Sequence, residues 1–140
     1  MKAKKEVVLI TGATSGIGYA FATIFGEDYI PYTVPDDQAL VIKTSKGLVV
    51  VLGCAHHGMI NTLLYAREIT GEERIHAVIG GTHLFRAGPD QLEQTIAKIE
   101  DFKVAHIGVS HCTGMPASMA LMQHFKDCFF FNHVGKTIEF

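Results

Sequence analysis

The sequence has no tryptophan, no block of like charge and no apolar run long enough to cross a membrane. It comprises 140 residues, of which 48% are hydrophobic, and its formal net charge at pH 7 is −2. Without a basic block, nucleic acid is not an expected partner, and without a long charged stretch a disordered tail is not expected. Because the apolar runs have only the length of strands, we expect no transmembrane helix and no membrane partner.

Cysteine is also scarce, with three residues at Cys54, Cys112 and Cys128. An odd number of cysteines without a secretory leader fits a reducing compartment better than a disulfide framework. We therefore expect a cytoplasmic protein. The chain is long enough for one domain with a real core, and too short for two independent domains of ordinary size.

Apolar runs alternate with helical patterns along most of the chain. Residues 6–12 form an apolar run that closes on a glycine turn, which predicts a buried parallel strand followed by a helix over residues 15–25. Residues 38–53 predict a hairpin that turns around residues 45–47. Further strands are predicted at residues 76–81, 104–111 and 128–140, the last as one or two strands, and helices at residues 60–69, 88–102 and 116–125. This order predicts an α/β fold, a single three-layer α/β/α sandwich with a mostly parallel or mixed sheet of about five or six strands.

The stretch "TGATSGIG" lies between the first predicted strand and helix, where a dinucleotide-binding turn would lie. Gly12 would permit the tight turn, Gly16 the approach of a pyrophosphate, and Gly18 close helix packing. Residues 5–26 resemble the opening strand and helix of short-chain dehydrogenases/reductases. That family also needs a tyrosine with a lysine four residues later, and no tyrosine here has one. We therefore favour a packing role for this unit over NAD(P) binding.

Eight histidines stand out against this composition, because clustered histidines are the commonest metal ligands. Four of them lie just past apolar runs: His56, His57, His83 and His111. Since the carboxyl ends of parallel strands meet at one edge of a sheet, these side chains should converge there. The other four lie within or beside predicted elements, where a packed or exposed role is expected: His76, His106, His124 and His133.

From about residue 28 to residue 140, the chain resembles a metallo-β-lactamase-fold metal-dependent hydrolase. The stretches that carry the resemblance are "DDQALVIKTSKGLVVVLGCAHHGMINTL", "AVIGGTHL", "SHCTG" and "VGKTIEF". They are similar to the C-terminal half of that family, in the branch with the dihydropterin-forming synthase of methanopterin-type biosynthesis. The resemblance implies that His56 and His111 occupy metal-ligand positions and that His83 occupies an active-site position. It also implies zinc, iron or manganese as the metal, whose bound hydroxide attacks a phosphoester, a lactone or a similar centre.

By the same resemblance Cys54, His57 and Cys112 are neighbours of the ligands or alternative ligands. The family's HxHxDH cluster, which its first half supplies, does not occur in the sequence. Our leading hypothesis at this point is an engineered or recombined chimeric protein without a complete natural active site. In it, a dehydrogenase-like unit at residues 1–27 joins a half metallo-β-lactamase-like fold at residues 28–140 within one domain, with residual metal binding at strand ends.

Two alternatives remain open. One is a metal-dependent hydrolase of this fold that acts through a dimer or through the missing half. The other is a nucleotide-binding module that uses the glycine-rich turn. A homodimer is also expected, through the apolar seam at which the two halves of the fold would meet.

Overall fold

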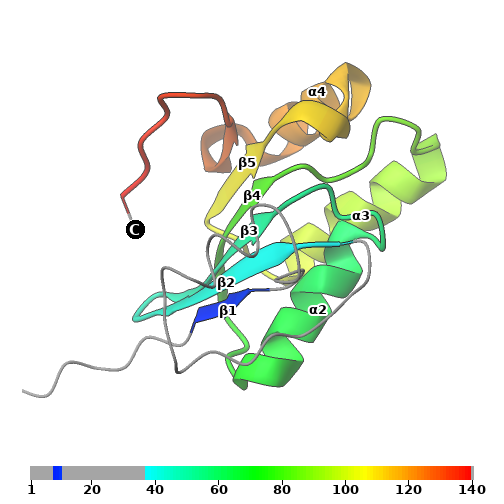
Figure 1. Ribbon diagram of the computed structural model, residues 1–140. Coiled ribbons are helices and arrows are strands. Elements are labelled where there is room, and N and C mark those ends of the chain that lie inside the picture. Colours follow the sequence, from blue (N-terminus) through cyan, green and yellow to red (C-terminus); the bar gives the residue numbers. More distant parts are fainter. Residues whose placement is uncertain (1–7, 11–36, 140) are drawn as a thin grey trace, which may run out of the picture.

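The computed structural model describes residues 8–10 and 37–139. These residues form a six-stranded sheet whose spatial order follows the chain, with helices between the later strands (Figure 1). The strands are β1 (Val8–Ile10), β2 (Ala39–Thr44), β3 (Gly47–Leu52), β4 (Ile75–Gly80), β5 (His106–Val109) and β6 (Phe129–Phe131). The helices are α2 (Met59–Thr70), α3 (Pro89–Asp101) and α4 (Met115–Phe125), with short 3₁₀ turns η1 (His111–Thr113) and η2 (Lys126–Cys128). The predicted α/β class with a mixed sheet is confirmed.

The hairpin of β2 and β3 forms as its sequence predicts. Thr44 pairs with Gly47 across the turn, and the pairing runs on to Ala39 opposite Leu52. Gly47 has a φ of 126°, and a Cβ at this position would lie 2.7 Å from the carbonyl oxygen of Arg74. A side chain would therefore clash with the chain that enters β4, which is why the turn needs glycine here.

Strands β3, β4, β5 and β6 are parallel neighbours, and one helix connects each strand to the next. Helix α2 ends where predicted, because Gly71 adopts a left-handed conformation and its N–H donates to the carbonyl of Arg67 at 2.9 Å. Helix α3 begins at Pro89, a residue whose fixed φ suits the first helical turn. In the described part of the chain no helix has the length and apolarity that a bilayer crossing requires.

The main core lies between the sheet and the three described helices, all of which cover the same face (Figure 1). Alternate residues of β3, Leu48 and Val50, point into this core. Each helix adds a side chain at most 1% exposed: Leu63 from α2, Ile99 from α3 and Leu121 from α4. Burying one such side chain contributes about 1.5–3 kcal/mol, so these contacts fix the helices against the strands.

The opposite face of the sheet is also apolar. Val49, Ala77 and Ile79 form a second buried cluster there, and Phe130 and Ile138 pack against it. The C-terminal segment thus covers part of this face, and no helix among residues 37–139 does so. The second helical layer expected from residues 15–25 lies outside the described residues.

The glycines predicted to bind a cofactor, Gly12, Gly16 and Gly18, also lie outside the described residues. So does the predicted division of the chain at residues 27 and 28. The parallel orientation predicted for residues 6–12 is wrong, because β1 pairs antiparallel with β2, with Val8 opposite Ile42. An apolar run indicates a buried strand, but it carries no information about the direction of the neighbour.

Candidate metal centre

Three loops meet at the carboxyl edge of the parallel strands. The N–H of Gly81 donates to the carbonyl of Gly53 at 3.1 Å, and the N–H of Ser110 donates to the carbonyl of Gly80 at 3.0 Å. These bonds hold the loops after β3, β4 and β5 against one another. The side chains that follow the three strands therefore gather at one edge, as expected from the parallel topology.

At this edge Cys54, His111 and Cys112 form what we call the thiol–imidazole cluster. The Sγ of Cys54 lies 3.1 Å from Nε2 of His111, and the Sγ of Cys112 donates to the carbonyl of Cys54 at 3.5 Å. One donor atom from each of the three residues lies within 4.8 Å of the others. Two sulfurs and an imidazole nitrogen are a donor set typical of zinc sites.

Gly81 makes room for this cluster. A Cβ at Gly81 would lie 2.5 Å from Sγ of Cys112 and 2.7 Å from Cε1 of His111. The end of β4 therefore supports the cluster only because residue 81 has no side chain. Nδ1 of His111 lies 3.3 Å from Oγ of Ser110, which orients Nε2 toward Cys54. The residues present thus fit a metal ion.

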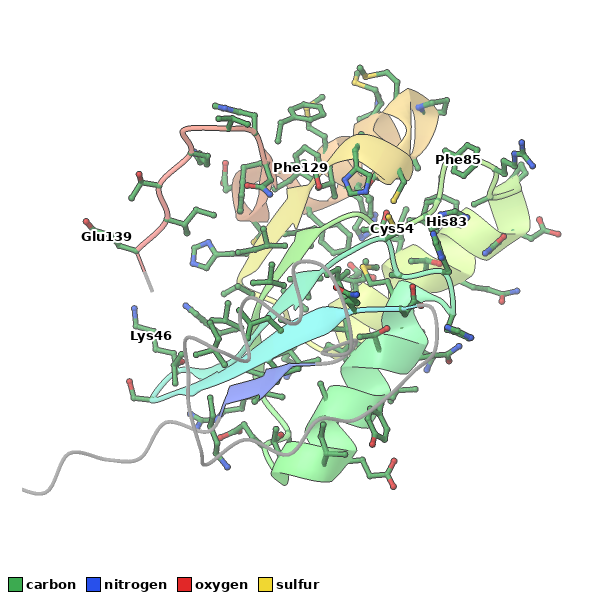
Figure 2. All side chains as sticks on the ribbon, viewed as in Figure 1. Lys46, Cys54, His83, Phe85, Phe129 and Glu139 are labelled. Carbon is green, nitrogen blue, oxygen red and sulfur yellow. The ribbon has the colours of Figure 1, made fainter. Side chains whose placement is uncertain are left out.

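His56 and His83 form a second group, the histidine pair. Their ring centroids are 4.6 Å apart at an interplanar angle of 71°, and the ring of His83 also meets Phe85 edge to face at 5.1 Å. Figure 2 labels Cys54, His83 and Phe85 at this end of the molecule, away from Lys46 in the β2–β3 turn. The histidine pair and the cluster therefore belong to the same edge of the sheet.

The backbone beside the histidine pair is strained. Ala55 and His83 have φ values of 52° and 53°, which residues other than glycine rarely adopt. Such conformations cost about 1–3 kcal/mol each and gather at functional sites. A pocket of about 220 Å³ opens beside the pair, with polar side chains of Asn61 and Gln91 in its lining.

Asp37 anchors the loop that carries His56 and His57. It is 8% exposed, and its carboxylate accepts the main-chain N–H groups of His56 at 2.7 Å and of His57 at 2.6 Å. Burial raises the pKa of Asp37, but the hydrogen bonds from these N–H groups and from the His57 ring, together with the His56 charge, bring it below the ordinary value. The carboxylate is therefore the favoured form.

Sequence reasoning missed Asp37, because no aspartate lies next to the two adjacent histidines in the sequence. The hairpin register could have found it. Since Ala39 pairs with Leu52, the residues just before β2 lie beside the loop just after β3, and the N–H of Gly53 donates to the carbonyl of Gln38 at 2.8 Å.

The predicted metal ligands thus divide between two groups. The structure brings His56 to His83, whereas it places His111 with Cys54 and Cys112. Among the histidines expected to be packed or exposed, His76 and His106 meet edge to face at 5.0 Å, and His124 lies 2.8 Å from Glu100. The loops that carry these histidines meet at one edge of the sheet, and the ligand assignment stays a prediction.

Comparisons with known proteins relate about three quarters of the chain to natural proteins. It is 38% identical over 107 residues to the 7,8-dihydropterin-6-methyl-4-(beta-D-ribofuranosyl)-aminobenzene-5'-phosphate synthase of Methanocaldococcus jannaschii, a match covering 76% of this chain and 36% of that protein. An uncharacterized protein of the same organism is 33% identical over 107 residues, covering 75% of this chain and 37% of that protein. No family model matches the sequence.

A comparison with solved structures also finds a related protein. The crystal structure of a metal-dependent hydrolase of the β-lactamase superfamily matches with a TM-score of 0.68 and 34% identity, over 74% of this chain and 40% of that chain. The matched residues are therefore related to this metal-dependent hydrolase and have part of its fold. The chain spans less than half the length of each of these relatives.

These matches overturn the hypothesis of an engineered or recombined chimera. About three quarters of the chain is related to natural proteins, and by their names two of these relatives are a synthase and a metal-dependent hydrolase. The hypothesis relied on the glycine-rich turn near the start of the sequence. A strand, a glycine turn and a helix form a packing unit that many unrelated α/β proteins use, so the pattern does not identify a source.

Proposed function

We propose that the chain is part of a metal-dependent hydrolase of the metallo-β-lactamase fold, with its reaction centre at the carboxyl ends of β3, β4 and β5. The observation that carries the proposal is the gathering of His56, His83, His111 and two cysteines at this one edge. The similarity to a metal-dependent hydrolase of the same fold supports it. This was the alternative hypothesis from the sequence.

In this proposal His56 and His111 hold metal, each through an imidazole nitrogen in its own group, and His83 lies beside His56 to contact the substrate. Bound zinc, iron or manganese would lower the pKa of a water ligand and so supply hydroxide for attack on a phosphoester or lactone. The carboxylate of Asp37 holds the two N–H groups of the His56 loop and so fixes where the His56 ring can lie.

The pocket beside the histidine pair is where a substrate group would bind. Asn61 at the start of α2 and Gln91 in the first turn of α3 offer amide donors and acceptors there. The side chain of Asn61 donates to the carbonyl of His57 at 2.7 Å, so its amide is already oriented. Such a lining suits a small polar substrate group.

We further propose that a second copy of the chain completes the site, through the face of the sheet that no described helix covers. That face carries the buried residues Val49, Ala77 and Ile79, each at most 8% exposed, with the half-buried Val51 beside them. Sheets pack face to face through such apolar surfaces. In analytical ultracentrifugation the chain should sediment as a dimer and Val51→Lys should weaken it, whereas Leu64→Lys, at a side chain 48% exposed, should not. A strict monomer at high concentration would rule this out.

The activity is tested with the purified chain loaded with zinc, manganese or iron. Hydrolysis of a chromogenic phosphodiester and of a simple lactone should be measurable, and both His56→Ala and His83→Ala should abolish it. The matched control is His133→Ala, at an exposed histidine whose Nδ1 lies near the carbonyl of Val134. Stoichiometric metal without hydrolysis of either substrate, or equal rates in His56→Ala, would contradict the proposal.

A further inference from the structure

We propose that Cys54, Cys112 and His111 bind one thiophilic metal ion directly, zinc in the cell, through two sulfurs and one nitrogen. The inference rests on the proposed function for placing a metal at this edge of the sheet. It goes further by assigning the cysteines as ligands and by predicting which metal is preferred. Thiolate ligands select zinc over manganese, whose usual ligands are oxygens.

The distances in the thiol–imidazole cluster suit a tetrahedral ion. Zinc bonds of about 2.3 Å to sulfur and about 2.0–2.1 Å to nitrogen place neighbouring ligand atoms about 3.5–3.8 Å apart. The three donor atoms already lie within 4.8 Å of one another, and the Cys54–His111 contact is 3.1 Å. The widest of these separations therefore has to close by about 1 Å or less to reach ligand geometry.

The backbone that carries the thiol–imidazole cluster is well packed. Cys112 lies in η1, where the N–H of Thr113 donates to the carbonyl of Ser110 at 2.9 Å. Thr113 is 1% exposed, and its hydroxyl lies 2.9 Å from that of Thr82. The loops after β4 and β5 are thus linked directly beneath the cluster. Ligands on such supported backbone lose little conformational freedom when they bind an ion.

The cluster also leaves an open ligand position. Three protein ligands with a fourth position for water or substrate are the usual arrangement of catalytic zinc, whereas structural zinc sites have four protein ligands. His111 is exposed, and both cysteines are half-buried, so solvent can reach the cluster. Each thiol would release its proton to solvent as the ion binds.

The test is a titration of the full chain with Co²⁺ under a non-chelating reductant. We expect about one equivalent to bind with a near-ultraviolet thiolate-to-cobalt charge-transfer band. Cys54→Ser and Cys112→Ser should each lose most of this band and weaken binding by about tenfold or more. Cys128→Ser is the matched control, because Cys128 is a free, half-buried cysteine in η2 outside the cluster. The band should persist unchanged in this variant.

X-ray absorption of the unmutated zinc-loaded chain gives a readout that does not depend on the folding of a variant. Two sulfur scatterers at about 2.3 Å are expected. Zinc with only nitrogen and oxygen neighbours would overturn the inference. So would a charge-transfer band that survives both cysteine substitutions, or a Cys54–Cys112 disulfide that persists under the reductant.

The two proposals fail in different ways. A sulfur-bound metal without hydrolysis would contradict the proposed function and leave the thiolate site standing. Hydrolysis that depends on His56, with no sulfur bound to the metal, would overturn the thiolate site alone. His56→Ala should keep the charge-transfer band, because the histidine pair contributes no sulfur.

Discussion

The carboxylate of Asp37 accepts the main-chain N–H of His57 at 2.6 Å, joining the residues before β2 to the loop after β3. The same carboxylate also accepts the N–H of His56 at 2.7 Å, so one buried side chain holds two successive peptide groups. A buried carboxylate that receives several hydrogen bonds is stabilised in its charged form. Asp37 therefore fixes the conformation from which His56 reaches the edge of the sheet.

Replacing Asp37 should loosen this loop. Asp37→Ala leaves two N–H groups without their acceptor, and we expect a loss of about 1–3 kcal/mol in the free energy of unfolding. Urea denaturation measures it, with Asp127→Ala, at an exposed aspartate, as the control. Metal-dependent hydrolysis should fall as well. Equal stability of the two variants would show that the hydrogen bonds of Asp37 do not hold the loop.

Gly81→Ala tests the support beneath the thiol–imidazole cluster. The new Cβ would lie 2.5 Å from Sγ of Cys112 and 2.6 Å from the carbonyl oxygen of Gly53, so these groups must move. We expect a cost of about 1–3 kcal/mol in stability and cobalt affinity lowered by about tenfold or more. Gly88→Ala is the control, because a Cβ there meets nothing within 4 Å. Unchanged cobalt affinity in Gly81→Ala would place the metal elsewhere.

Two neighbouring leucines of helix α2 offer a matched pair of variants that tests the packing of the core. Leu63 is 0% exposed beneath the helix, while its neighbour Leu64 is 48% exposed. Leu63→Ala should lower the free energy of unfolding by about 2–5 kcal/mol through lost burial and a cavity. Leu64→Ala should change it by no more than about 0.5 kcal/mol. Similar losses for both variants in denaturant titrations would mean that α2 does not pack on the sheet through this face.

The protonation of His76 should make the free energy of unfolding depend on pH. Burial lowers its pKa below the usual 6.5, and the nearby charges of His106 and Lys46 lower it further. Above the unfolded value of 6.5, His76 is neutral in both states and contributes no pH dependence. As pH falls below that value the unfolded chain gains the proton first, so stability decreases until the pH passes the lower folded pKa.

The measurement compares the free energy of unfolding at about pH 8 and about pH 5.5. His76→Gln should reduce the loss of stability between the two conditions, because the variant has no ring to protonate. His133→Gln serves as the control at an exposed position. A pH dependence that is identical in the unmutated chain and in His76→Gln would contradict this account.

Much of the fold could be predicted because its signals are local. The hairpin around Gly47, the end of α2 at Gly71 and the start of α3 at Pro89 each depend on the backbone preferences of one or two residues. The direction of β1 could not be predicted, because strand pairing depends on residues far away in sequence. The exposure of Met115 and Met119 on α4, which is 66% and 39%, likewise depends on how the helix packs against the sheet.

The sequence by itself determined that strands alternate with helices, and that histidines and cysteines follow the strands that become β3 and β5. Tertiary structure decided which of these side chains meet: His111 lies with two cysteines, and His56 lies with His83. The physical reason is that spacing along the chain places a residue at a strand end, whereas loop conformation and neighbouring strands direct its side chain. The left-handed backbone conformation at His83 directs its ring, and the absence of a side chain at Gly81 leaves room for His111 and Cys112.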